Sequence, residues 1–276
     1  VVMGCALQQG VQGGNIARLA LLRAGLPVTV SGQSMDRQCS SGVMSIATAA
    51  KQIMVDGMQI CIGAGVDSIS MVQNDKMRVG MDPSLVAMHP NIHMPMLQTA
   101  EVVAKRYNVS RDRQDEYGYQ SQVRTAAAQA AGKFDDEIVP MTATMAMVNK
   151  ETKEVTTHEI TLSKDEGNRP ETTLESLKGL KPVIEGGVIT AGNASQLSDG
   201  ASASVLMEAK EAARRGLTPL GAYRGMAVAG LEPDEMGIGP IYAIPKLLKA
   251  NGLTMNDIGL WELNEAFAVQ VIHCAD

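Results

Sequence analysis

The first 65 residues alternate between short apolar segments and amphipathic helical patterns, and this alternation constrains the fold more than any other feature. Apolar side chains recur at helical spacing in residues 15–24 and again in residues 41–55. Short strands are predicted at residues 27–30 and 59–65. This rhythm predicts an α/β fold in which a mostly parallel sheet carries helices on its faces.

The pattern changes near Met71 and returns only after residue 196, so residues 71–196 are predicted to be an insertion on the sheet. Within it the sequence predicts an irregular stretch at residues 72–98, followed by helices at 99–107 and 111–131. A hairpin is predicted at residues 137–163, and a capping box over 172–175, beginning at Thr172, is predicted to open a short helix. Further on, helices are predicted at residues 208–215, 241–251 and 265–276 and a strand at 258–263.

Charge and composition exclude several classes of function. The chain has 24 Lys and Arg against 30 Asp and Glu, a net charge of −6, whereas nucleic acids and anionic membranes call for a basic surface. No apolar run approaches the roughly 20 residues that cross a bilayer. Four cysteines in 276 residues favour free thiols in a reducing compartment, and we predict a cytoplasmic protein with no nucleic acid partner and no membrane insertion.

Cys39 is the candidate nucleophile. It lies in the segment Arg37-Gln38-Cys39-Ser40-Ser41-Gly42, where a strand-like segment ends and a helix is predicted to begin. The positive end of the helix dipole and nearby free N–H groups favour the thiolate, which is the reactive form of cysteine. The alternative is a small buried cysteine at a tight strand–helix junction.

The other cysteines and the histidines carry weaker signals. Cys5 and Cys61 lie in apolar strand patterns, and Cys274 has no helix-start context. His89 and His93 are four residues apart, but Pro90 makes a helix through both implausible. No Cys-x-x-Cys pair exists, so no metal site is expected.

Three further segments have both a functional and a structural interpretation. Residues 63–67 resemble the front of a dinucleotide fingerprint without its third glycine, and we favour close packing at a strand end. The glycine-rich residues 186–195 would let a ligand approach the backbone, or form an ordinary loop. Asn264, predicted between a strand and a helix, could assist an oxyanion or simply cap the helix.

Taken in order, several motifs resemble those of the thiolase family of acyl-CoA C-acyltransferases. They are spread over essentially the whole chain at family-like intervals: Gly13-Gly14-Asn15-Ile16-Ala17-Arg18, Arg37-Gln38-Cys39-Ser40-Ser41-Gly42, Thr99-Ala100-Glu101, Thr190-Ala191-Gly192-Asn193-Ala194-Ser195, Asp199-Gly200-Ala201, Met236-Gly237-Ile238-Gly239-Pro240 and Asn264-Glu265-Ala266-Phe267.

The resemblance implies duplicated α/β halves with mixed sheets and an inserted α+β loop domain. Residues 1–70 would belong to the N-terminal half, rejoined by about residues 197–217, while 71–196 would form the loop domain and 218–276 the start of the C-terminal half.

The resemblance also implies ping-pong acyl transfer, with coenzyme A as substrate or product and no permanently bound cofactor. Cys39 would carry the acyl group as a thioester, and Asn264 would orient an oxyanion-hole water. The remaining residues would contact the CoA (Arg169, Ser176, Ala191 and Ser195) or line the acyl and pantetheine pocket (Met96, Ala266 and Phe267). The implied partners are acyl-CoA, CoA and further copies in a homodimer or homotetramer.

The sequence departs from the family in two motifs. The Gly-His-Pro motif, whose His activates the nucleophile, has no counterpart in these 276 residues. The later Cys-x-Gly motif, whose Cys moves the substrate α-proton, has none either, since Cys61-Ile62-Gly63 lies in an apolar strand pattern. The chain also begins and ends inside predicted elements, so we expect an internal piece of a longer protein.

Two alternatives remain open from sequence. A ketoacyl synthase-type condensing enzyme would share the fold and a cysteine at a helix start, although residues 264–267 and the insertion favour CoA substrates. A thiolase-like acyl-CoA or lipid-binding protein without catalysis would also fit a chain that lacks part of the catalytic set.

Overall fold

The computed structural model describes residues 1–74 and 80–276, which form two compact units. The first unit contains residues 1–93, 197–230 and 239–261, and the second contains residues 94–196, 231–238 and 262–276. The three-part domain division inferred from the sequence stays a prediction.

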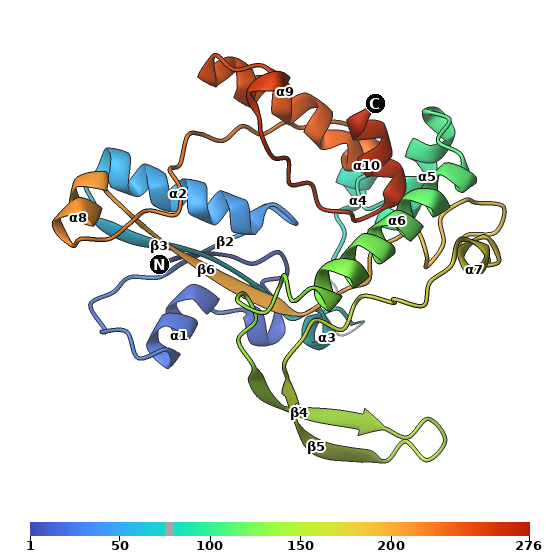
Figure 1. The fold of residues 1–276 in the computed structure, drawn as a ribbon, viewed down its shortest axis with the longest axis horizontal. Coiled ribbons are helices and arrows are strands. Elements are labelled where there is room, and N and C mark those ends of the chain that lie inside the picture. The colour runs from blue at the N-terminus through green and yellow to red at the C-terminus, as the bar shows by residue number, and fades with distance from the viewer. Residues whose placement is uncertain (75–79) are drawn as a thin grey trace. The chain divides into compact units, whose positions relative to one another are not determined.

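The first unit is built on a four-stranded sheet in the order β2-β1-β3-β6 (Figure 1). Its strands are β1 (Val2–Gly4), β2 (Gln33–Met35), β3 (Ile60–Asp67) and β6 (Gly200–Met207). Strand β1 runs parallel to β2 and β3, whereas β6 runs antiparallel to β3 from Ile60↔Met207 to Asp67↔Gly200. The sheet is therefore mixed, as the resemblance implied.

Helices cover both faces of this sheet. Helix α1 (Ile16–Arg23) lies on one face and α2 (Ser41–Asp56) on the other (Figure 1). The Asn15 side chain accepts a hydrogen bond from the Arg18 N–H and so caps α1. Val2, Ala49 and Cys61 form a buried cluster between α2 and the sheet. The other helices of the unit are α3 (Ile69–Val72), α4 (Pro83–Met88), α8 (Ala209–Arg214) and α9 (Gly239–Asn251).

Glycines in the strands let α2 lie directly against the sheet. A Cβ atom on Gly4 would come within 2.2 Å of the Ser41 backbone, and one on Gly63 would come within 2.7 Å of the Ile46 Cα. The buried Ser45 hydroxyl crosses the same contact and donates to the Ala64 carbonyl at 2.6 Å. The interpretation of residues 63–67 as a close-packing segment is confirmed, and the start of α2 is fixed on the sheet.

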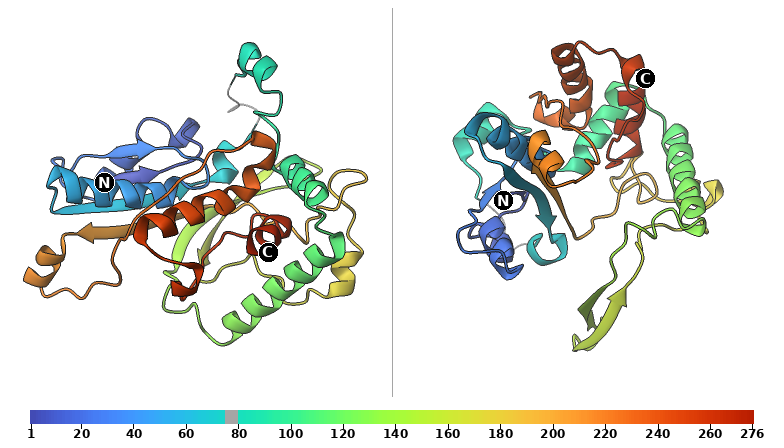
Figure 2. Two further views of the ribbon diagram at one scale, coloured as in Figure 1. Left: turned by 90° about the horizontal axis from the view of Figure 1, so that it is seen from above. Right: turned by 60° about the vertical axis from the view of Figure 1, so that its left-hand side comes forward.

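The second unit combines helices with a separate two-stranded sheet. Its helices are α5 (Met96–Arg106), α6 (Arg111–Ala130), α7 (Leu174–Lys178) and α10 (Ala268–Ala275). Strands β4 (Met141–Val148) and β5 (Val155–Leu162) form the predicted hairpin, which projects away from α6 (Figure 2). The Ser110 side chain accepts a hydrogen bond from the Arg113 N–H and so caps α6.

The predicted strand at residues 27–30 is wrong. Pro27 to Val30 form a turn, and the strand begins later, at Gln33. The Arg18 guanidinium donates to the Val28 carbonyl at 2.9 Å and also to the Val30 carbonyl. These side-chain donors take the place of the sheet partners that the predicted strand would have had.

The predicted strand at residues 258–263 is also wrong. Ile258 follows a single 3-10 turn, Met255–Asp257, and none of the described strands pairs with this segment. An apolar alternating sequence becomes a strand only where a neighbour accepts its backbone hydrogen bonds.

Smaller differences concern helix boundaries. The capping box falls one residue later than predicted, on Thr173 and Ser176. Helix α4 lies in the stretch predicted to be irregular, where Asp82 caps it through the Ser84 N–H. Residues 75–79 of that stretch lie outside the described residues. In the described part of the chain, no helix combines the length and the hydropathy needed to cross a membrane.

The glycine contact predicts a position-specific loss of stability. Gly4→Ala should lower the free energy of unfolding by about 3 kcal/mol, because its Cβ would overlap the Ser41 backbone and that backbone cannot move without lifting α2 from the sheet. Gly42→Ala is the matched control, because a Cβ there meets nothing within 4 Å and alanine favours the helix. Urea unfolding of both variants measures the difference, and equal midpoints would contradict the close-packing account.

Candidate active site

Cys39 lies in the turn that joins β2 to α2, one residue before the N-cap Ser40. Its side chain is exposed and its thiol is free. The preceding residue, Gln38, has a φ of 48°, in the left-handed region that side-chain-bearing residues seldom occupy. The turn therefore presents Cys39 at the surface beside the start of a helix, which excludes the alternative of a small buried cysteine at this junction.

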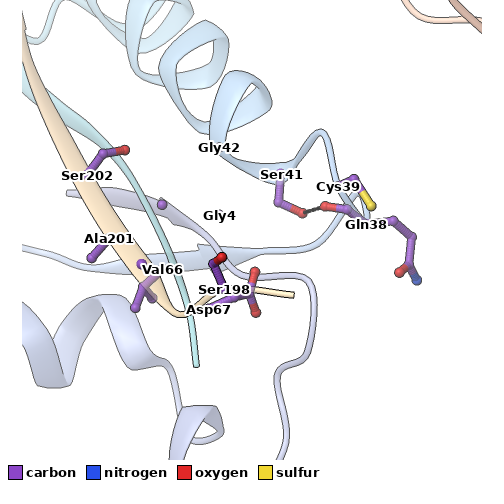
Figure 3. Close-up of a pocket in the computed structure, with 12 residues that line it drawn as sticks. Gly4, Gln38, Cys39, Ser41, Gly42, Val66, Asp67, Ser198, Ala201 and Ser202 are labelled. Carbon is purple, nitrogen blue, oxygen red and sulfur yellow. Dashed lines mark hydrogen bonds between the residues drawn. The ribbon is translucent and has the colours of Figure 1, made fainter. Parts of the chain in front are cut away.

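Hydrogen bonds close this turn from both sides. The Gln38 N–H donates to the Asp36 carboxylate at 2.6 Å. The Ser41 hydroxyl donates to the Gln38 carbonyl at 2.6 Å and accepts from the Arg37 N–H at 2.7 Å. Figure 3 shows the Ser41–Gln38 bond beside Cys39. The backbone around the thiol is thus held by short contacts rather than by burial.

Cys39 lines a pocket of about 360 Å³ within the first unit (Figure 3). The pocket is walled by the turn, by the carboxyl ends of β1 and β3, and by the segment that leads into β6. Beside Cys39 its polar lining residues are Gln38, Ser41, Asp67, Ser198 and Ser202. Asp67, Ser198 and Ser202 were not predicted as site residues, because only the antiparallel pairing of β3 with β6 brings them to this pocket.

Asp67 fixes the wall of the pocket opposite the turn. Its carboxylate accepts hydrogen bonds from the backbone N–H groups of Ala6 at 3.0 Å and Leu7 at 3.2 Å, and from the Gln12 side chain at 3.1 Å. These donors fold the segment after β1 onto the end of β3. The aspartate therefore has a structural task at the edge of the pocket.

The other two cysteines of the first unit are buried. Burial and the neighbouring Asp67 carboxylate raise the pKa of the Cys5 thiol to about 11. Burial also raises the pKa of Cys61. Both thiols stay protonated near neutral pH, in agreement with their interpretation as core residues.

Asn264 is exposed in the loop that precedes α10. The helix begins only at Ala268, with Phe267 as its N-cap, so Asn264 does not cap it. The next residue, Glu265, accepts hydrogen bonds from Tyr117 and Ser121 of α6, each at 2.7 Å. Burial and, as the second cause, the hydrogen bond to Glu265 raise the pKa of the Tyr117 hydroxyl. The Asn264 carboxamide thus lies on a loop whose position is fixed by the hydrogen bonds of the next residue, Glu265.

The glycine-rich loop around residues 190–195 is held by buried polar contacts. The Asn193 side chain donates to the buried Asp115 carboxylate at 3.0 Å and accepts from the Thr190 N–H at 2.8 Å. Asp115 also accepts from Arg111 at 2.6 Å. The Ser195 N–H donates to the Ala266 carbonyl at 2.9 Å, so this loop lies beside the Asn264 loop. The structure therefore brings Ala191, Ser195, Ala266 and Phe267 to one region of the second unit.

The remaining predicted site residues also belong to the second unit. Met96 and Phe267 line one small apolar pocket between α5 and α10. Ser176 is exposed, and its hydroxyl is engaged in the capping box of α7 with Thr173. Arg169 is exposed, and its backbone N–H donates to the Gln122 side chain at 2.8 Å. The roles assigned to these residues from sequence stay predictions.

Comparisons with known proteins identify the family. A model of the thiolase N-terminal domain matches residues 1–210, and a model of the thiolase C-terminal domain matches residues 217–276. The chain belongs to the thiolase family. A 3-ketoacyl-CoA thiolase of Bacillus subtilis is 44% identical over 99% of this chain and 70% of its own length. A peroxisomal 3-ketoacyl-CoA thiolase 2 of Arabidopsis thaliana is 44% identical and is covered over 59% of its length.

Solved structures of thiolases share the fold. The dimeric peroxisomal thiolase of Saccharomyces cerevisiae superposes with a TM-score of 0.85 at 33% identity, over 99% of this chain and 68% of that one. A human mitochondrial 3-ketoacyl-CoA thiolase in complex with CoA superposes with a TM-score of 0.82 at 36% identity, over 99% and 69%. The predicted thiolase-like fold class is thus confirmed. The chain spans between 59% and 70% of the length of these relatives.

Metal ligands do not gather in the described part of this thiolase chain. No group of three or more His, Cys, Asp or Glu side chains among residues 1–74 and 80–276 could hold a metal ion. His273 instead stacks on Tyr107, with ring centroids 3.9 Å apart.

The exposure of the cysteines predicts selective alkylation. At neutral pH iodoacetamide should label Cys39 far faster than Cys5 or Cys61, because both of these are buried and their pKa values are raised. Cys274, which is half-buried, should react more slowly than Cys39. Peptide mass spectrometry over time measures each rate, with Cys39→Ser as the control. Equal rates at all four cysteines would contradict this account.

The buried contacts of Asn193 predict a large effect of its loss. Asn193→Ala should destabilise the fold by about 2 kcal/mol, because the buried Asp115 carboxylate and the Thr190 N–H each lose a partner. Ser195→Ala, in the same loop but exposed, should change stability by no more than about 0.5 kcal/mol. Thermal unfolding compares the two variants, and similar losses would show that the Asn193 contacts do not hold the loop.

Proposed function

We propose that this chain carries the nucleophile of a thiolase that cleaves 3-ketoacyl-CoA or, in reverse, condenses two acyl-CoA molecules. The observation that carries the proposal is Cys39, an exposed thiol on a short hydrogen-bonded turn at the edge of a pocket. Among the four cysteines it alone combines an exposed side chain with a place directly before a helix of two or more turns. Relatives named 3-ketoacyl-CoA thiolase at 44% identity support the assignment.

The first half-reaction forms an acyl enzyme. The Cys39 thiolate attacks C3 of the 3-ketoacyl-CoA, and the C2–C3 bond breaks. The electron pair of that bond moves to C2, which takes up a proton and leaves as acetyl-CoA. The acyl group remains on the Cys39 sulfur as a thioester. The family's Cys-x-Gly motif supplies the proton. The one Cys-x-Gly sequence of this chain, Cys61-Ile62-Gly63, lies in β3 with its thiol buried and does not correspond to that motif.

The second half-reaction transfers the acyl group to CoA. The thiol of a fresh CoA loses its proton and attacks the thioester carbonyl, and the bond to the Cys39 sulfur breaks. The products are the free Cys39 thiolate and an acyl-CoA shorter by two carbons. Each half-reaction passes through an oxyanion, which hydrogen-bond donors fixed before the reaction stabilise most effectively.

Asn264 is proposed to orient a water molecule for such an oxyanion. Its loop is tied to α6 through Glu265 and to residue 195 through the Ala266 carbonyl. A donor on a tied loop loses little freedom when the charge develops, which favours the assignment.

Arg169, Ser176, Ala191 and Ser195 are proposed to contact the CoA nucleotide and pantetheine, and Met96, Ala266 and Phe267 to line the acyl and pantetheine pocket. The backbone pairing of Ala194 with Phe267 supports a joint role for the two loops. The pocket shared by Met96 and Phe267 supports an apolar acyl contact. A relative solved in complex with CoA supports the substrate class.

The proposed partners are acyl-CoA, CoA and a second copy of the chain, in a homodimer or homotetramer. A dimeric thiolase among the structural neighbours supports the dimer. The cytoplasmic location stays a prediction, since the relatives include peroxisomal enzymes and a bacterial one.

The proposal predicts a specific covalent intermediate. The intact protein incubated with acetoacetyl-CoA in the absence of free CoA should gain the mass of one acetyl group on the peptide that contains Cys39. Adding CoA should remove that mass, because the thioester is the intermediate of the second half-reaction. Mass spectrometry of the digested protein after an acid quench measures both steps.

Cys39→Ser should abolish the acetyl adduct. It should also lower the rate of thiolytic turnover by at least about a thousandfold, because the hydroxyl is a far weaker nucleophile than the thiolate at neutral pH. Cys274→Ser is the matched control and should retain the adduct. Tight CoA binding with no adduct on Cys39 in the intact protein would instead support the non-catalytic binder.

A further inference from the structure

The backbone before the candidate nucleophile is held in an unfavourable conformation. Gln38 has a φ of 48°, and a residue with a side chain in this region costs about 1–3 kcal/mol. Its side chain is exposed, so no burial of that side chain compensates the cost. Other contacts in the turn must therefore hold Gln38 in this conformation. They matter for the site because the direction in which the next residue, Cys39, projects depends on the conformation of Gln38.

The Ser41 hydroxyl spans the turn. It accepts a hydrogen bond from the Arg37 N–H at 2.7 Å and donates one to the Gln38 carbonyl at 2.6 Å. The Ser41 N–H donates to the same carbonyl at 3.0 Å. One side chain therefore bonds to the peptide group before Arg37 and to the peptide group after Gln38, and so bridges the residue with the unfavourable φ.

Ser41 itself has no freedom to follow the turn. It is 3% exposed and begins α2, whose first turn rests on Gly4 of β1. One turn further along, Ser45 ties the helix to Ala64 of β3. Ser41 thus connects the exposed turn that carries Cys39 to the helix on the sheet.

The neighbouring polar groups do not replace this connection. The Ser40 hydroxyl donates to the Arg37 carbonyl at 2.9 Å and so holds the peptide group before Gln38, whereas the Ser41 hydroxyl holds the peptide group after it. The Asp36 carboxylate holds the Gln38 N–H, but Asp36 is exposed and belongs to the turn itself.

We propose that Ser41 is the positioning residue for Cys39: its hydroxyl holds Gln38 in the left-handed conformation and so fixes the thiol toward the pocket. This inference rests on the proposed function of Cys39 as nucleophile. Ser41 does not react with substrate. It acts through the backbone, and its loss should affect a reaction that needs an oriented sulfur more than one that needs only an exposed sulfur.

The test compares two reactions of the same sulfur in Ser41→Ala. Acylation of Cys39 by acetoacetyl-CoA should slow about tenfold, the factor that corresponds to the release of one unfavourable backbone conformation. Alkylation of Cys39 by iodoacetamide, a small reagent that needs no fixed approach, should slow by less than about threefold. Rapid-quench mass spectrometry on the intact protein gives both rate constants.

Ser45→Ala is the matched control, because it removes an equally buried hydroxyl of the same helix that makes no contact with the turn. It should leave the ratio of the two rates unchanged. If Ser41→Ala and Ser45→Ala change both rates alike, Ser41 has only a structural role and the inference fails.

The Gln38→Gly substitution provides a second, independent test of the same inference. Glycine adopts a positive φ without a steric penalty, so the effect of Ser41→Ala on acylation should fall below about threefold in the Gln38→Gly background. An undiminished tenfold loss in that background would overturn the inference. If wild-type Cys39 is alkylated but never acylated, the proposed function fails instead, and the two failures are therefore distinguishable.

Discussion

The close approach of α2 to the sheet is the contact on which the candidate site depends. Gly4 and Gly63 leave no room for a side chain, and Ser45 bonds across the interface to Ala64. The start of the helix consequently has a fixed height above the strands. The exposed turn that carries Cys39 is attached to this fixed point, so a surface thiol gains a defined position without being buried.

The second unit also fixes the position of loops, but it does so with hydrogen bonds to carboxylates. The two loops that carry predicted site residues are held by carboxylates that collect several donors, rather than by glycine contacts. Asp115 ties the loop of residues 190–195 through Asn193, and Glu265 ties the Asn264 loop through Tyr117 and Ser121. Because charged acceptors form the stronger hydrogen bonds, a few such groups suffice to order loops with few apolar side chains.

The sequence predicted the regular elements well where periodicity was long and the ends were marked. Helices over residues 41–55 and 111–131 and the hairpin before residue 163 were found within a few residues. The predictions failed where a short apolar run had no neighbour to pair with, at residues 27–30 and 258–263. Strand formation depends on a distant partner, and local sequence carries little information about that partner.

The features of the candidate site likewise fall into those that local sequence predicts and those that depend on the tertiary structure. The sequence by itself determined that Cys39 precedes a helix and that the ordered motifs belong to a thiolase, because both are properties of local residue order. Only the tertiary structure decided that Cys39 is exposed, that Gln38 has a positive φ, and that Asp67, Ser198 and Ser202 share its pocket. The shared pocket arises from strands that pair across more than 130 residues, and pairing over such separations follows from packing rather than from local pattern.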